Sequence, residues 1–262
     1  MESINLCLCT ACNFRCIMCP QSYHLGHYED KSIKTHEFEN QKKGCISKAT
    51  LKRLFDSLSE MNAITDSFAM QWNGESMMHP DFTKLYKCIC QRNCREYFFR
   101  QIIIDTNASF FNPKFNKRFV AITEKYQQTL ILTLSLDSVN AQTFQKIKRA
   151  GIKNIPNNCK DLMLKRTKKG NITIIIQALV LEENQKELFD FYRYWSEFFN
   201  KHNMKYNVIY SPGQRGPAIK NYILFRKVSP DLIGGRLWEQ FQPIKNKIDE
   251  MENEFKCKRG LL

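Results

Sequence analysis

The 262-residue sequence predicts an α/β fold in which parallel strands alternate with helices. Two patterns support this class: six apolar segments rich in β-branched residues recur along the chain, and amphipathic segments with helical spacing separate them. Strands joined by right-handed helical crossovers lie parallel in one sheet. The chain is also long enough for one large barrel or two small domains.

The strands are predicted at residues 4–9, 67–72, 101–105, 130–136, 172–181 and 205–210. The helices between and after them are predicted at residues 48–61, 81–94, 113–126, 140–149, 157–169 and 184–203. Ser47 and Asp81 are residue types that cap helix N-termini. The fifth strand is almost entirely apolar, as expected of a strand buried on both faces. The long polar stretch after the first strand lacks periodicity and predicts a loop.

The last part of the chain lacks the pattern of a seventh strand–helix unit. We expect residues 1–217 to form the barrel and residues 218–262 to form a short helical extension, with its charged helix at 236–255. Cys257 is the only cysteine in this extension.

Composition narrows the function classes. The formal net charge of +14 suits an anionic partner, but the lysines are scattered and no basic strand with interleaved aromatic residues stands out. We therefore favour an acidic peptide over nucleic acid. The longest apolar runs are too short to span a membrane. Eleven cysteines without a secretory signal indicate a reducing, cytoplasmic setting, where cysteines serve metals or packing rather than disulfides.

The most informative motif follows the first strand. Cys12, Cys16 and Cys19 have the spacing Cys-x3-Cys-x2-Cys. Iron–sulfur clusters usually have four cysteine ligands, so three would leave one iron of a four-iron cluster open to another ligand. A zinc site completed by His24 or His27 is an alternative, and disulfides are a second one.

The run from Cys12 through Cys19 to Pro20 resembles the signature of the radical S-adenosylmethionine (radical SAM) superfamily. The resemblance implies a partial (β/α)6 barrel and a [4Fe–4S] cluster held by Cys12, Cys16 and Cys19. It also implies that SAM binds the open iron and that an electron cleaves it to a radical that abstracts hydrogen from a substrate. We also expect Met18 to be a cofactor-binding residue, although the family often has an aromatic residue at this position.

Two further motifs follow the second and third strands. Asn73-Gly74-Glu75 resembles the family's Gly-Gly-Glu motif, which implies contacts to the amino group of SAM. The alternative is an ordinary turn with a solvated glutamate. Thr106-Asn107 resembles the family's Thr-Asn-Gly turn, which implies hydrogen bonds near the cofactor. Ordinary asparagine turn chemistry is equally compatible with it.

The fourth and fifth strands carry the remaining candidates. Ser135 and Asp137 resemble the Ser-x-Asp-Gly strand end of the peptide-maturing SPASM-related branch, and strand alternation places them on one face. The resemblance implies that they point toward the SAM ribose or the substrate. Gln177 lies within an apolar strand, where its buried amide either faces SAM or finds a partner in the barrel interior.

The resemblance implies a radical SAM enzyme that receives electrons from a donor such as flavodoxin or ferredoxin. The substrate is expected to be a peptide or protein, and the alternative is oxidation or epimerisation of a sugar or another small molecule. Two readings from other classes stay open. One is a zinc-binding protein associated with nucleic acid, and the other is a barrel that keeps the cluster but serves as a scaffold or electron carrier.

Overall fold

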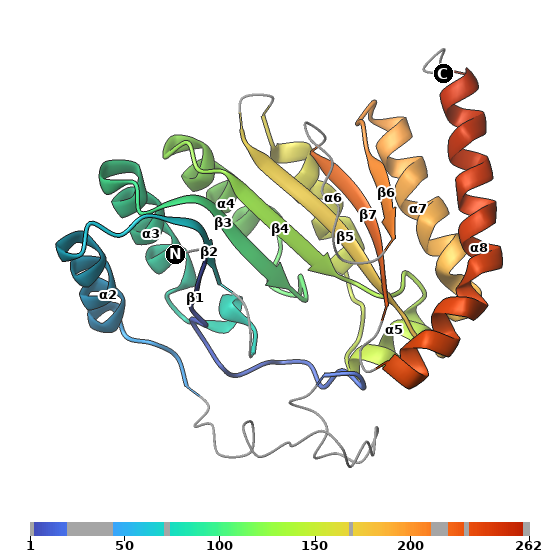
Figure 1. Ribbon diagram of the computed structural model, residues 1–262, viewed down its shortest axis with the longest axis horizontal. Coiled ribbons are helices and arrows are strands. Elements are labelled where there is room, and N and C mark those ends of the chain that lie inside the picture. The colour runs from blue at the N-terminus through green and yellow to red at the C-terminus, as the bar shows by residue number, and fades with distance from the viewer. Residues whose placement is uncertain are drawn as a thin grey trace.

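The computed structural model describes residues 3–19, 44–70, 74–167, 170–210, 220–227 and 231–258. Its centre is one seven-stranded sheet with the order β1-β2-β3-β4-β5-β7-β6, in which every pairing is parallel. The strands are β1 (Ser3–Asn5), β2 (Thr65–Ala69), β3 (Phe99–Thr106), β4 (Leu130–Ser135), β5 (Ile172–Val180), β6 (Asn207–Tyr210) and β7 (Asn221–Lys227). The sheet curves but does not close, so it is a partial barrel (Figure 1).

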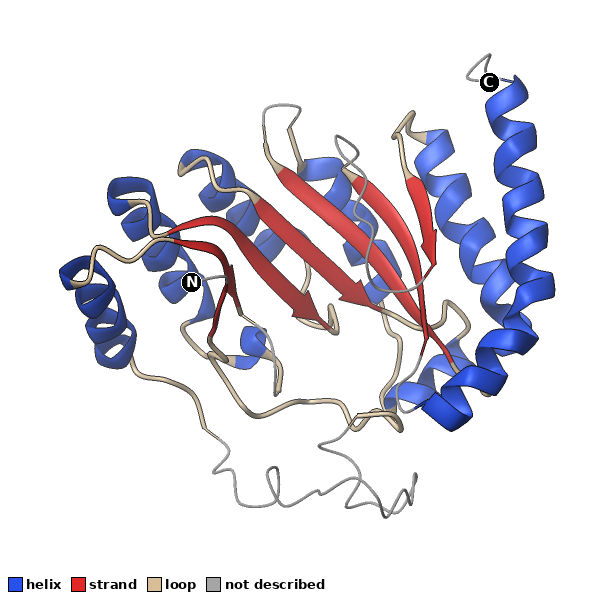
Figure 2. Ribbon diagram, in the orientation of Figure 1, coloured by secondary structure: helices blue, strands red, loops and turns tan. Residues whose placement is uncertain are grey.

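Helices form a layer against one face of this sheet (Figure 2). They are α2 (Lys48–Glu60), α3 (Phe82–Glu96), α4 (Pro113–Lys125), α5 (Ala141–Lys148), α6 (Ile155–Lys165), α7 (Leu188–Lys201) and α8 (Asp231–Lys258), with short 3-10 turns η2 (Ser76–Met78) and η3 (Gln185–Glu187). All six predicted helices are therefore present. None of the described helices is long and apolar enough to cross a membrane.

Local capping explains where several helices begin. Ser47 accepts a hydrogen bond from the Thr50 amide at the start of α2, and the Asn140 side chain accepts from the Gln142 and Thr143 amides at the start of α5. Asp81 stands at the predicted N-cap of α3 but makes no capping bond with its side chain. Its carboxylate pairs instead with Lys84 at 2.7 Å.

The expectation that residues 218–262 contribute no strand is wrong. Asn221–Lys227 forms β7, which pairs with β5 on one side and β6 on the other. Ile223 and Phe225 within it are fully buried. Its four consecutive apolar residues, Tyr222, Ile223, Leu224 and Phe225, are typical of a buried strand, and the prediction overlooked this local signal. A strand inside the sheet therefore follows the expected boundary at residue 217, and the helical extension begins only at Asp231.

The apolar core lies between the sheet and the helices, and α8 completes it at the β6 edge. Leu237, Phe241 and Ile248 of α8 are buried in this core. Glu252 of the same helix accepts hydrogen bonds from Tyr192 and Tyr206, each at 2.6 Å. The C-terminal helix is thus packed onto the barrel by both apolar and polar contacts.

Candidate active site at the carboxyl ends of the strands

The segment after β1 carries the three motif cysteines past the carboxyl ends of the strands to α5 (Figure 1). Backbone hydrogen bonds hold it there: the Arg15 amide donates to the Lys148 carbonyl at 3.2 Å, and the Ile17 amide donates to the Ile147 carbonyl at 2.9 Å. The ring of Phe14 also packs edge-on against Phe144 of α5. The end of α5 therefore supports the cysteine loop, which we define as residues 9–19.

The three motif cysteines are free and half-buried. Cys12, Cys16 and Cys19 lie close enough that each thiolate would raise the energy of another: Cys19 acts on both Cys12 and Cys16, and Cys12 acts on Cys16. Burial raises the pKa of the Cys12 thiol, and it raises the pKa of Cys16 to about 11. Metal binding would therefore have to displace protons from buried thiols.

This arrangement fits a cluster better than a single ion. Among the described residues, no three His, Cys, Asp or Glu side chains converge closely enough to hold one metal ion. A four-iron cluster has a different requirement, because each thiolate binds its own iron. The three neighbouring free thiols could each supply one such ligand. His24 and His27, the candidates for completing a zinc site, lie outside the described residues.

A disulfide closes the base of the loop that contains these cysteines. Cys9 and Cys45 are joined across a sequence separation of 36, in an isolated antiparallel bridge with a Cα–Cα distance of 4.0 Å. Flanking bonds run from the Thr10 amide to the Gly44 carbonyl and from the Ile46 amide to the Leu8 carbonyl. The expectation that the cysteines form no disulfides is wrong for this pair, because the fold places two distant segments side by side.

Gly74 lies where the chain passes close to the backbone of the cysteine loop. Its φ is +92°, and a Cβ there would stand 2.4 Å from the Cys9 carbonyl oxygen and 2.5 Å from the Thr10 carbonyl carbon. The next residue, Glu75, donates its amide hydrogen to the Ala11 carbonyl at 2.8 Å. Only glycine is compatible with both the backbone conformation and this contact.

The Glu75 carboxylate is buried, so the alternative of a solvated glutamate is wrong. Its Oε1 accepts from the Met77 amide at 3.1 Å and from the Thr106 hydroxyl at 2.9 Å, and its Oε2 accepts from the Asn107 amide at 2.8 Å. Burial raises the pKa of Glu75, while these hydrogen bonds oppose the rise. The carboxylate thus joins the segment after β2 to the end of β3.

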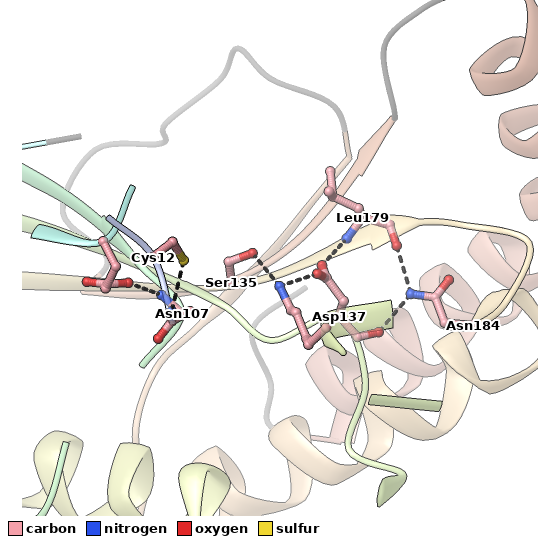
Figure 3. Close-up of polar contacts among 8 residues, drawn as sticks. Cys12, Asn107, Ser135, Asp137, Leu179 and Asn184 are labelled. Atoms are coloured by element: carbon pink, nitrogen blue, oxygen red, sulfur yellow. Dashed lines mark hydrogen bonds and ion pairs between the residues drawn. The ribbon is translucent and has the colours of Figure 1, made fainter. Parts of the chain in front are cut away.

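Asn107 connects this network to the cysteines. Its side-chain amide donates to Asn13 Oδ1 at 2.9 Å and approaches Cys12 Sγ at 3.8 Å, as Figure 3 shows for Cys12. Its Oδ1 also accepts from the Ser109 amide, which is asparagine turn chemistry. Asn107 therefore shapes the turn and also contacts the cysteine motif.

A buried ion pair lies on the other side of the cysteine loop. Asp137 Oδ2 is 2.5 Å from Lys148 Nζ, which also donates to the Ser135 hydroxyl at 3.0 Å. The other oxygen of Asp137 accepts from the Leu179 amide, and Asn184 donates to the carbonyls of both Asp137 and Leu179 (Figure 3). Ser135 and Asp137 thus both contact Lys148. Strand alternation is not the reason, because β4 ends at Ser135 and Asp137 lies in the following turn with a φ of +63°.

Lys148 is the residue that the sequence analysis missed. Burial lowers its pKa, but Asp137 and the Cys16 thiolate outweigh that effect and raise the pKa. The cation also favours the charged forms of Cys16 and Glu75. No recognised motif contains Lys148, so it was not singled out from the other 39 Lys and Arg residues. The only available signal was its position at the end of the helix that follows the Ser135–Asp137 strand end.

Gln177 and Asn73 are two further residues that the sequence predicted to bind the cofactor. Gln177 is buried on β5, opposite Ser135 of β4, and its backbone carbonyl accepts from the Leu136 and Asp137 amides. Asn73 lies outside the described residues.

Met18 lies on the same loop, next to the third cysteine. It is half-buried and packs against the small apolar cluster of Ile17, Ile147 and Leu181. These contacts attach the loop to α5 and to the residues that follow β5. Packing alone accounts for an apolar residue at this position.

Comparison with known proteins identifies solved structures that have a similar fold. No family model matches the sequence, and no curated protein matches it. Solved structures do match: SuiB of Streptococcus suis, bound to the precursor peptide SuiA, has a TM-score of 0.55 and 13% identity over 98% of this chain and 46% of SuiB. The protein anSMEcpe with bound AdoMet has a TM-score of 0.59 and 13% identity over 99% of this chain and 62% of that chain.

A radical SAM methyltransferase from Sphaerobacter thermophilus has a TM-score of 0.51 and 10% identity, covering 92% of this chain and 63% of that one. These structural neighbours are radical SAM enzymes, and the partial barrel is the fold that they share with this chain. The chain spans between 46% and 63% of the length of the three proteins. At this level of identity the likeness concerns the fold.

Proposed function

We propose that this chain is a radical SAM enzyme. In this proposal Cys12, Cys16 and Cys19 hold a [4Fe–4S] cluster beside bound SAM. The observation that carries the proposal is that three free, mutually interacting thiols lie on one loop at the carboxyl ends of parallel strands, where α/β barrels place their active sites. When bound together, the two cofactors supply reductive cleavage of SAM and a radical that removes a hydrogen atom from the substrate.

The chain's own residues would organise this site. Gly74 allows the backbone to approach the cysteine loop, and Glu75 presents an acceptor for the amino group of SAM while holding the Thr106–Asn107 turn. Lys148 supplies the positive charge that a carboxylate or a thiolate-bound cluster would need.

Six further residues complete the proposed cofactor site. Asn107 lies against Cys12, and Ser135 and Asp137 lie at the end of β4. We propose that Ser135, Asp137 and Gln177 face the ribose of SAM or the substrate. The positions of Met18 and of Asn73 beside the motif residues are the basis for including them.

For the substrate we propose a peptide or protein. Two of the structural neighbours were solved with peptides: SuiB with its precursor peptide SuiA, and anSMEcpe with the Cp18Cys peptide. The net charge of +14 suits an acidic peptide. Nine of the eleven cysteines lie outside the Cys9–Cys45 disulfide, and on this basis we propose a cytoplasmic location.

The test is anaerobic reconstitution with iron and sulfide, followed by addition of dithionite and SAM and chromatography of 5′-deoxyadenosine. We expect 5′-deoxyadenosine from the wild-type chain and none from Cys16→Ala, with Cys94→Ser as the control because Cys94 is free and exposed. Stoichiometric zinc in a colourless preparation would contradict the proposal. A brown protein without turnover, even with candidate peptides present, would favour the scaffold or electron-carrier reading.

A further inference from the structure

The segment from α5 to α6 is unusually basic. Residues 141–160 include five basic residues and no Asp or Glu. Lys148 is buried in the ion pair described above, but Lys146, Arg149 and Lys153 are exposed. Exposed Arg15 belongs to the adjoining cysteine loop, and its guanidinium donates to the Cys12 and Phe14 carbonyls. We call Arg15, Lys146, Arg149 and Lys153 the α5 basic surface.

Two hollows flank this surface. One, of about 460 Å³, is lined by Gln142, Gln145, Lys146 and Arg149. The other, of about 380 Å³, extends from Asn13 and Phe14 of the cysteine loop to Lys153 and the start of α6. No acidic residue lines either hollow. The nearby carboxylate of Glu187 is half-buried and accepts hydrogen bonds from Thr143 and Ser138.

The basic surface adjoins the cysteine loop directly. The carbonyls of Ile147 and Lys148 accept the Ile17 and Arg15 amides on either side of Cys16. The neighbouring residues Lys146 and Arg149 are exposed. A protein seated on the surface would therefore be separated from the Cys16 region by little more than the end of α5.

The same surface is separate from the proposed substrate side. Neither hollow is lined by Glu75, Ser135, Asp137 or Gln177, the residues assigned to SAM and substrate at the strand ends. A peptide that must present a hydrogen atom to SAM would have to reach those residues. An electron donor needs only proximity to the cluster, so the position of the surface favours a donor over a substrate.

We infer that the α5 basic surface is the docking site for a small acidic one-electron carrier protein, an inference that rests on the proposed function. The carrier loses one electron and the cluster gains it, and no bond forms or breaks in the transfer. Complementary charge raises the rate of encounter, and salt screens it. Dithionite, a small chemical reductant, does not need a protein-sized docking surface.

The test compares two reductants on the double variant Lys146→Glu/Lys153→Glu. With reduced flavodoxin below saturation, we expect 5′-deoxyadenosine formation to slow about tenfold or more relative to wild type. The dithionite-supported rate and the iron content should stay unchanged. The control Lys87→Glu/Lys201→Glu makes the same charge change at exposed positions on α3 and α7. It should leave both rates unchanged, and added salt should slow only the flavodoxin-supported reaction.

Equal rates for the surface and control variants with flavodoxin would overturn the inference. An equal loss with both reductants would also overturn it, because the substitutions would then be acting on the cofactor site. If the wild-type chain makes no 5′-deoxyadenosine even with dithionite, the proposed function fails rather than the docking surface.

A second measurement does not depend on turnover. Carbodiimide joins lysine amines to carboxylates, so flavodoxin cross-linked to the metal-free protein should be found on Lys146 or Lys153 after peptide mapping. Cross-links concentrated on Lys87, Lys201 or other distant lysines would contradict the inference. So would a poly-glutamate peptide that cross-links at Lys146 and Lys153 when flavodoxin does not, since the surface would then serve acidic peptides.

Discussion

Lys148 and Asp137 form an ion pair in which both side chains are removed from solvent, with an Nζ–Oδ2 distance of 2.5 Å and exposed side-chain fractions of 2% and 0%. The pair joins the end of α5 to the end of β4. Because the Lys148 carbonyl also accepts the Arg15 amide, the same residue connects the sheet to the cysteine loop. The geometry of the candidate site therefore depends on a contact between residues that are 11 positions apart in the sequence.

Replacing Lys148 with methionine should lower the free energy of unfolding by about 3–5 kcal/mol, because it leaves the buried Asp137 carboxylate without its cation. Urea denaturation measures the change. The double variant Lys148→Met/Asp137→Asn removes both charges and should lose less than the sum of the two single variants. Additive losses would show that the two side chains do not stabilise each other.

Gly74→Ala should disrupt the cysteine loop. The new Cβ would meet backbone atoms of Cys9 and Thr10 at 2.4 and 2.5 Å, and the positive φ adds strain of about 1–3 kcal/mol. We expect a lower melting temperature and a loss of iron bound after reconstitution. Gly151→Ala is the matched control, since its Cβ would find only a side-chain carbon at 4.0 Å. Normal iron content in Gly74→Ala would contradict the assigned close contact.

If the Cys9–Cys45 disulfide forms, the number of titratable thiols should depend on whether the protein has been reduced. Denatured, metal-free protein kept without reductant should titrate nine thiols, and reduced protein should titrate all eleven. Reduction should lower the free energy of unfolding by about 2–4 kcal/mol, because the bond closes a long loop in the unfolded chain. Cys45→Ser should abolish this response to reductant, while Cys94→Ser should keep it. Eleven thiols in unreduced protein would show that the bond does not form.

Truncation after residue 217 tests the expected domain boundary. The shortened chain loses β7, which lies between β5 and β6, and α8, whose Leu237 and Phe241 are buried in the core. We expect no cooperative unfolding transition by circular dichroism during urea denaturation. A cooperative transition comparable to that of the full chain would show that residues 1–217 fold independently.

Local sequence patterns predicted most of the secondary structure. Each predicted strand from 67–72 to 205–210 overlaps an observed strand, because apolar β-branched runs report burial within a sheet directly. The first strand is shorter than expected, since Cys9 pairs with Cys45 instead of continuing along β2. β7 was missed although its apolar run Tyr222–Phe225 is a local strand signal, because residues after 217 were expected to be helical.

The sequence predicted only those residues of the candidate site that belong to recognisable motifs. Glu75 and Asp137 were identified by motif, but their burial was not, and Lys148 was not identified at all. A motif names residue types at a spacing along one segment. It does not report which distant charge compensates a buried carboxylate, because that depends on how α5 packs against the strand ends.

The sequence by itself determined the class of fold and the residues that we propose as cluster ligands. Strand and helix periodicity are local properties, and the spacing of Cys12, Cys16 and Cys19 lies within a single loop. Only the tertiary structure decided the place of β7 inside the sheet, the Cys9–Cys45 bond, the glycine requirement at residue 74 and the pairing of Lys148 with Asp137. Each of these depends on contacts between segments that are brought together by folding, and their energies come from burial and close approach.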